Sequence, residues 1–212
     1  IPIKKGPRNE PDYLDSEEVT EILRQPDRST LEGQRDHALL AFLYNTGARI
    51  QEALNLCPSN IRLAAPAQVK LYGKGRKERI CPLWPETAEL LAALLERQPR
   101  PDHEPLFVNR YGCPLGAAGV RFKLAQYVRA AAKALPSLQK KRVHPHTFRH
   151  TAGVQLVAAG VDVSVIRSLL GHVSLDTTNH YARANLETKR RALEQVERPT
   201  RPGSPPRWRR NP

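Results

Sequence analysis

Apolar side chains recur at intervals of three and four residues along most of the chain, a spacing typical of amphipathic helices. In LDSEEVTEILRQ, residues 14–25, Asp15 is placed to cap the first turn and Glu18 to reach back to it. Gly47 is expected to follow the last turn of a second helix. Helical spacing is found in nine segments: 14–25, 34–47, 49–56, 85–97, 116–134, 146–159, 162–170, 175–184 and 186–196.

The residues between the third and fourth of these segments do not show helical spacing and contain two short runs typical of strands. AQVKLY (67–72) and ERICPL (78–83) are short strand candidates, and the glycine-bearing turn GKGRK (73–77) joins them as a hairpin. A further apolar run, LFV (106–108), can complete a small sheet. The pattern therefore predicts an α+β fold that is mainly α-helical and has one small three-stranded antiparallel sheet.

The ends of the chain differ from its middle. Residues 1–12 are polar and proline-rich and are expected to form a linker, while residues 13–196 form one folded domain. Residues 197–212 are rich in proline and arginine and are expected to be a disordered basic tail. The sequence contains no Met, even at position 1, so we expect a chain that is processed or cut from a longer protein.

The charge balance narrows the class of partner. Lys and Arg outnumber Asp and Glu by 34 to 21, which leaves a net charge of +13 and indicates an anionic partner such as nucleic acid. Charge alone leaves open a basic protein without a specific ligand. No apolar run is long enough to span a membrane and no secretory signal is visible, so a cytoplasmic location is expected. Cys57, Cys81 and Cys113 form no CxxC pair, which fits a reducing compartment.

The stretch HPHTFRH, residues 144–150, concentrates candidate chemistry. Its histidine spacing is not HExxH and no Cys or carboxylate is close in sequence, so a metal site is not favoured. Pro145 suits a first helical turn, which places His146 and Arg149 on one face. Helix-start amides and a guanidinium fork both favour a phosphate. A capped helix with solvated His and Arg side chains is the alternative.

Three other motifs accompany this one in a fixed order. They are YNTGARIQEALNL (44–56), YGKGRKERICPL (72–83) and LLGHVSLDTTNHYAR (169–183), in which Tyr181 follows His172 by nine residues. Over roughly residues 12–195 the ordered set resembles the catalytic domain of the tyrosine recombinases, the phage integrase family. By that resemblance the catalytic residues are Arg49, Lys74, His146, Arg149, His172 and Tyr181. Gly153 in mid-helix is a small departure from the family pattern. A larger one is that the sequence does not include the family's N-terminal helical domain, to which residues 1–12 would be the linker.

The resemblance implies an integrase-like fold and site-specific DNA recombination through a 3′-phosphotyrosine, without a metal or cofactor. Tyr181 would attack the DNA phosphorus, His146 would take its proton, and Lys74 would protonate the leaving 5′-oxygen. Three further side chains would bind the phosphate oxygens as negative charge develops: Arg49, Arg149 and His172.

The partners that follow are double-stranded DNA and further copies of the chain. Residues 116–134 are a candidate for the major groove, and residues 186–196 are a candidate for docking on an apolar groove in cis or between protomers of a tetramer on DNA. The nucleoid is then the expected location. Eight basic residues are expected to contact DNA: Arg76, Lys77, Arg79, Arg121, Lys123, Lys140, Lys141 and Arg142.

Two other functions stay open. Residues 151–172, with Gly160 in the turn, can be interpreted as the helix–turn–helix of a non-catalytic DNA-binding regulator. A type IB topoisomerase shares the phosphotyrosine chemistry. The DNA target and the genetic element served do not follow from the sequence.

Overall fold

The computed structural model describes residues 13–73, 75 and 77–171. The predicted helices at 175–184 and 186–196, the linker and the C-terminal tail lie outside these residues. The described part contains seven α-helices: α1 (Ser16–Arg24), α2 (Leu31–Thr46), α3 (Ile50–Leu54), α4 (Pro85–Arg97), α5 (Ala117–Ala131), α6 (Pro145–Ala158) and α7 (Val163–Leu170). Its strands are β1 (Ile61–Arg62), β2 (Gln68–Tyr72) and β3 (Glu78–Pro82). The α+β, mainly helical fold class is confirmed.

Local signals fix several helix ends. The backbone N–H of Asp15 donates to Glu18 Oε2 at 2.9 Å, which confirms the predicted reach-back at the start of α1. Helix α2 begins three residues earlier than predicted, because the Thr30 hydroxyl caps it by accepting from the Gly33 N–H at 3.0 Å. Helix α6 begins at Pro145, as predicted.

The sheet is antiparallel with the order β1-β2-β3, and its third strand is not the predicted one. Residues 106–108 form no strand; Val108 makes only an isolated bridge to Pro114. All three side chains of this run are buried, and the ring of Phe107 lies 6.3 Å from that of Phe42. A short buried apolar run resembles a strand whether or not it pairs, since burial produces the same pattern.

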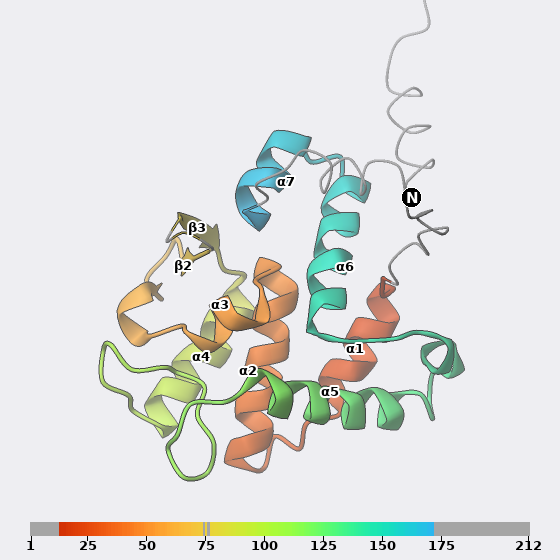
Figure 1. The fold of residues 1–212 in the computed structure, drawn as a ribbon, viewed down its shortest axis with the longest axis horizontal. Coiled ribbons are helices and arrows are strands. Elements are labelled where there is room, and N and C mark those ends of the chain that lie inside the picture. The colour runs from red at the N-terminus through yellow and green to blue at the C-terminus, as the bar shows by residue number, and fades with distance from the viewer. Residues whose placement is uncertain (1–12, 74, 76, 172–212) are drawn as a thin grey trace, which may run out of the picture.

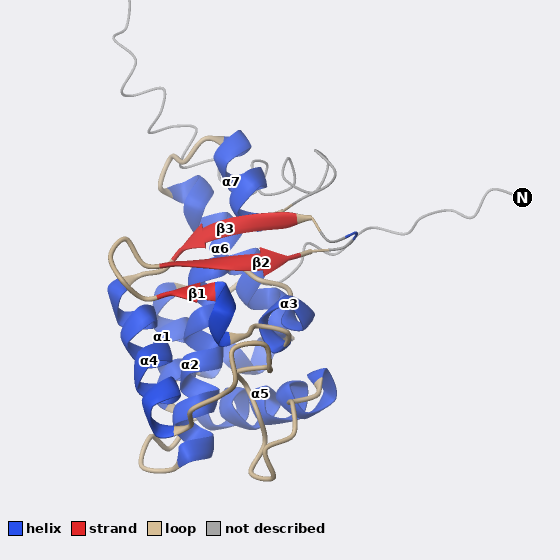
Figure 2. Ribbon diagram, turned by 90° about the vertical axis from the view of Figure 1, so that its left-hand side faces the viewer, coloured by secondary structure: helices blue, strands red, loops and turns tan. Residues whose placement is uncertain are grey.

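Helix α2 runs through the main hydrophobic core. Its residues Leu39, Phe42 and Leu43 are at most 1% exposed and pack with apolar residues of the other helices and of the sheet. In Figure 2, α7 lies beyond β3, α6 passes behind the sheet toward α7, and α1, α2, α4 and α5 lie on the other side of the sheet (Figures 1 and 2). A second, smaller core joins α7 to α6 through Val154, Ile166 and Leu170.

In the ranges that the structure describes, no helix combines the length and the apolar character that crossing a bilayer requires.

Gly47, at the end of α2, is a position where substitution should be costly. Its φ is +57°, and a Cβ there would lie 2.3 Å from Leu170 Cδ2 of α7. Gly47→Ala should therefore lower the free energy of unfolding by at least about 2 kcal/mol in urea denaturation. Gly119 in α5 is the matched control, since nothing lies near a Cβ there. Gly119→Ala should be neutral or stabilising by less than about 1 kcal/mol, and equal effects of the two changes would contradict this prediction.

Candidate active site

Arg149 is buried where three helices meet. It is 1% exposed, although it carries a charge. Its Nη1 donates to the carbonyl of Gly47 at the end of α2 at 2.7 Å, and its Nη2 donates to the carbonyl of Leu170 at the end of α7 at 2.6 Å. The alternative of a solvated arginine is therefore wrong for this residue, which instead ties α6 to the ends of two other helices.

Arg49 stands at the N-terminus of α3, two residues after Gly47 in the sequence. Its backbone N–H donates to Glu52 Oε2 at 2.8 Å and its Nη1 to Glu52 Oε1 at 2.9 Å. Its Nη2 reaches the carbonyl of Gly171 at 3.3 Å. The side chain is 38% exposed, so a ligand can approach this guanidinium from solvent.

Arg79 of β3 shares the same carboxylate. Its Nη1 and Nη2 donate to the two carboxylate oxygens of Glu52 at 3.0 and 2.6 Å, and its Nε donates to the carbonyl of Leu169 at 2.9 Å. Burial alone would raise the pKa of Glu52, but the hydrogen bonds and charge of Arg79 and Arg49 outweigh it and hold this pKa below its usual value. Burial in turn disfavours the charged Arg79, and its contact with Glu52 reverses that effect and raises the pKa of Arg79.

The last carbonyls of α7 are the common acceptor of these arginines. We call residues 169–171 the α7 turn; it ends at Gly171, whose φ of +64° is left-handed. Helix C-termini leave such carbonyls without partners and concentrate negative partial charge there, so guanidinium donors suit the position. Three consecutive carbonyls accept from three arginines of different elements: Leu169 from Arg79, Leu170 from Arg149 and Gly171 from Arg49.

His146 lies beside this group on the first turn of α6. Its ring stacks near that of His144, with 6.4 Å between the centroids, and the residue keeps an exposed surface. Crowding of the imidazole by surrounding protein atoms, together with the positive charges of Arg149, His144 and Arg49, lowers the pKa of His146. A lowered pKa favours the neutral form of the ring, which is the form that accepts a proton.

The structure therefore brings Arg49, His146 and Arg149 into one neighbourhood from two distant motifs. Four residues that the sequence singled out lie outside the described part of the chain: Lys74, Arg76, His172 and Tyr181. Glu52 was missed as a functional residue. A signal for it existed, because it stands three residues after Arg49, at the spacing of a capping box.

A model described as the phage integrase family matches residues 12–188 of the chain. The chain belongs to this family. Among curated proteins, y4rC of Sinorhizobium fredii, named an integrase/recombinase, is 39% identical over 196 residues, or 92% of the chain. The tyrosine recombinase XerC of Chlamydia muridarum is 33% identical over 194 residues, or 90% of the chain. The chain spans 59% of the length of each of these relatives.

Solved structures of recombinases share the fold of this family member. The structure of XerA recombinase superposes with a TM-score of 0.74 at 26% identity, covering 92% of this chain and 68% of that one. The XerH site-specific recombinase, in a post-cleavage complex with its difH substrate, gives 0.75 at 26% identity, covering 92% of this chain and 56% of that one. The catalytic domain of bacteriophage HP1 integrase gives 0.61 at 20% identity and covers 88% and 96%, which shows the same fold. The resemblance drawn from the motifs is thus confirmed.

The basic residues predicted to contact DNA in this integrase-family domain fall into two groups. Arg79 is held inside, as described above. Lys141 is directed toward α1, where its Nζ donates to Glu18 Oε2 at 2.6 Å and to the Tyr13 carbonyl at 2.9 Å. The other described candidates lie on exposed positions: Lys77, Arg121, Lys123, Lys140 and Arg142.

Metal-ligating side chains do not gather in the part of this family member that the structure describes. Within residues 13–73, 75 and 77–171 no group of three or more His, Cys, Asp or Glu side chains comes together. Cys57, Cys81 and Cys113 are unpaired thiols. Metal-free chemistry stays a prediction for the whole site.

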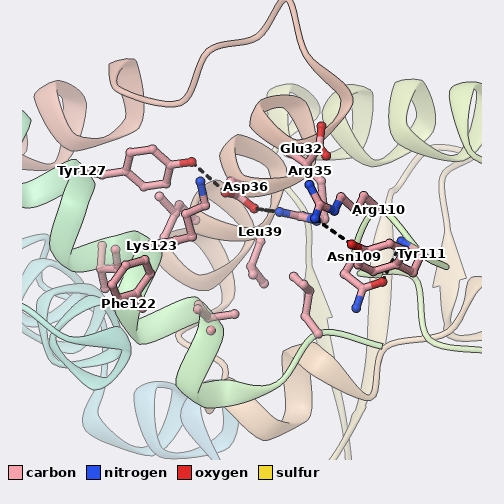
Figure 3. A pocket seen from close by; sticks show the side chains of 15 residues that line it. Glu32, Arg35, Asp36, Leu39, Asn109, Arg110, Tyr111, Phe122, Lys123 and Tyr127 are labelled. Carbon is pink, nitrogen blue, oxygen red and sulfur yellow. Dashed lines mark hydrogen bonds and ion pairs between the residues drawn. The ribbon is translucent and has the colours of Figure 1, made fainter. Parts of the chain in front are cut away.

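A pocket of about 390 Å³ lies apart from the three arginines, between α2, α5 and residues 109–115. Its walls are mostly apolar, and Tyr111 and Phe122 at its rim are exposed (Figure 3). The Tyr127 hydroxyl donates to Asp36 Oδ2 at 2.7 Å, and burial raises the pKa of Tyr127. Of the predicted catalytic residues that the structure describes, neither Arg49, His146 nor Arg149 lines this pocket, so the candidate active site is the surface around Arg49 and His146.

Proposed function

We propose that this chain is the catalytic domain of a site-specific DNA recombinase that cuts and rejoins strands through a 3′-phosphotyrosine. The observation that carries the proposal is the convergence of Arg49, Arg149 and His146 beside the α7 turn, which directly precedes His172 in the sequence. Family membership and the XerH complex with DNA after cleavage support the same reaction class.

In the proposed reaction the Tyr181 oxygen bonds to the scissile phosphorus while the bond from phosphorus to the 5′-oxygen breaks. The phenol, with an ordinary pKa near 10, is a weak nucleophile at pH 7 and must lose its proton during attack. Neutral His146 accepts that proton, and Lys74 supplies one to the departing 5′-oxygen. A 5′-hydroxyl of a second strand then attacks the phosphotyrosine and reverses these steps.

The phosphate would be held by the cationic side chains of the site. Negative charge grows on its non-bridging oxygens as the phosphorus becomes five-coordinate, and preorganised donors stabilise that charge. Arg49 is exposed enough to meet the phosphate first. Burial is the largest cause of the lowered pKa of His146, and the positive charges of Arg149, His144 and Arg49 that add to it would also attract such an anion. Arg149 and His172 supply further donors.

Binding of the duplex would rest on the exposed basic residues of α5 and of the segment before α6. Each phosphate they neutralise releases counterions, so affinity should fall steeply with salt. Recombination joins two duplexes, so a tetramer is the proposed assembly, with residues 186–196 docked in cis or on a neighbouring protomer. The nucleoid is the proposed location, since the substrate is there.

The test uses a library of suicide duplexes, each with a nick close to the cleavage site. After cleavage the short fragment that carries the free 5′-hydroxyl diffuses away, so the phosphotyrosine cannot be resealed. In buffer with EDTA, the chain should form an adduct that survives denaturing electrophoresis. Binding without any adduct would favour the helix–turn–helix regulator. Relaxation of supercoiled DNA without strand exchange would favour the topoisomerase, because both enzymes form the adduct but only a recombinase joins two duplexes.

A further inference from the structure

Arg79 has no part in the proposed chemistry, yet it is built firmly into the site. Its side chain is 8% exposed, and that of its partner Glu52 is 4% exposed. Its guanidinium donates through all three nitrogens, twice to Glu52 and once to Leu169. To bind a DNA phosphate, Arg79 would have to leave a buried carboxylate without its bidentate partner, which is costly.

The space around the pair is closed by two glycines. A Cβ at Gly171 would lie 3.2 Å from Cδ and Nη1 of Arg79, so the arginine stem rests against the backbone of the α7 turn. A Cβ at Gly73, where the hairpin leaves β2, would lie 3.4 Å from Glu52 Oε1. The pair therefore fills the junction of the hairpin, α3 and the α7 turn, and each of these elements contacts it.

Arg79 also limits how strongly the Glu52 carboxylate can attract Arg49. The two guanidiniums share one buried carboxylate, and Arg79 makes the bidentate contact. Without that contact Glu52 would depend on Arg49 alone, and a buried carboxylate would draw the Arg49 guanidinium inward. The carbonyl of Leu169 would lose its guanidinium donor at the same time and keep only the weak Cys81 thiol donor at 3.4 Å, which loosens the turn that precedes His172 in sequence.

We infer that Arg79 is a positioning residue for the reaction, which fixes the α7 turn and, through Glu52, the orientation of Arg49. The expected effect on the reaction rate rests on the proposed function. The expected effect on the α7 turn and on Arg49 rests on the described contacts alone. It replaces the expectation that Arg79 neutralises a phosphate at the hairpin tip.

Arg79→Lys tests this inference, because lysine keeps the charge but cannot form the fork and reach Leu169 together. The matched control is Arg62→Lys, since Arg62 is an exposed strand arginine that donates to Pro66 and Gln68 nearby in the sequence. Each variant is measured on a suicide duplex from the library for its single-turnover rate constant at saturating DNA, reaction amplitude, DNA Kd and salt slope. Hydrogen exchange over residues 163–171 is measured on the same proteins without DNA.

For Arg79→Lys the rate constant should fall about 10- to 100-fold, as expected for slight misplacement of reacting groups. The Kd should stay within about twofold and the salt slope should not change, since no phosphate contact is lost. Exchange at the α7 turn should rise. Arg62→Lys should behave as wild type in every measurement.

Three outcomes would overturn the inference. A weaker Kd with a salt slope reduced by about one and an unchanged rate constant would make Arg79 a phosphate ligand. A lower amplitude with an unchanged rate constant would leave it a role in general stability alone. If wild type forms no adduct, the proposed function fails by itself, and unchanged exchange at the α7 turn would then refute the positioning role as well.

Discussion

An Arg149→Lys variant should form the covalent protein–DNA adduct at least about 100-fold more slowly than wild type. The reason lies in geometry rather than charge. Arg149 donates to the carbonyls of Gly47 and Leu170 with two nitrogens of one planar group. Lysine concentrates its charge at one point on a flexible stem, so it cannot bridge both carbonyls and also meet a phosphate at a fixed angle.

The same change should reduce stability. One buried carbonyl would lose its donor, which costs about 1–3 kcal/mol and is measurable by urea denaturation. Single-turnover rate constants, corrected by the folded fraction, separate this cost from the catalytic effect. Arg24→Lys is the matched control, because the Arg24 side chain is 67% exposed on α1. A corrected rate constant equal to that of wild type would remove Arg149 from the proposed site.

A Tyr181→Phe variant should bind DNA within about twofold of wild-type affinity and form no adduct at all. Removing one phenolic oxygen takes away the nucleophile, while the basic residues that bind phosphates are unchanged. The comparison uses electrophoretic mobility for binding and denaturing gels for the adduct. Tyr111→Phe serves as control, since Tyr111 is 74% exposed and lies in the loop beside α5. An undiminished adduct in Tyr181→Phe would assign the nucleophile to another residue.

The helices of residues 14–170 were predictable because their signals are local. Apolar spacing, the reach-back of Glu18 and the left-handed Gly47 all act within a few residues of the helix end they determine. The sheet was half predictable, since the hairpin of β2 and β3 is local. Its third strand, β1, has two residues, which are too few to show the alternation typical of a strand. The buried apolar run at 106–108 has the composition of a strand and was predicted in its place.

The roles of single basic residues were harder to predict, because they depend on partners far along the chain. Glu52 stands 27 residues before Arg79, and Glu18 stands 123 residues before Lys141. Charge in the sequence shows that a side chain needs an anion; it does not show whether that anion is a buried carboxylate or a phosphate. The candidate site itself was named from the order of its motifs, and its convergence at the α7 turn emerged only from the fold.

The most direct measurement is the identity of the residue joined to DNA. Wild-type protein trapped on the suicide library is digested with nuclease and protease, and the peptides are sequenced by mass spectrometry. We expect a nucleotide attached through its 3′-phosphate to the phenolic oxygen of Tyr181. A nucleotide on any other side chain, or no modified peptide from a folded, DNA-bound protein, would contradict the proposed function.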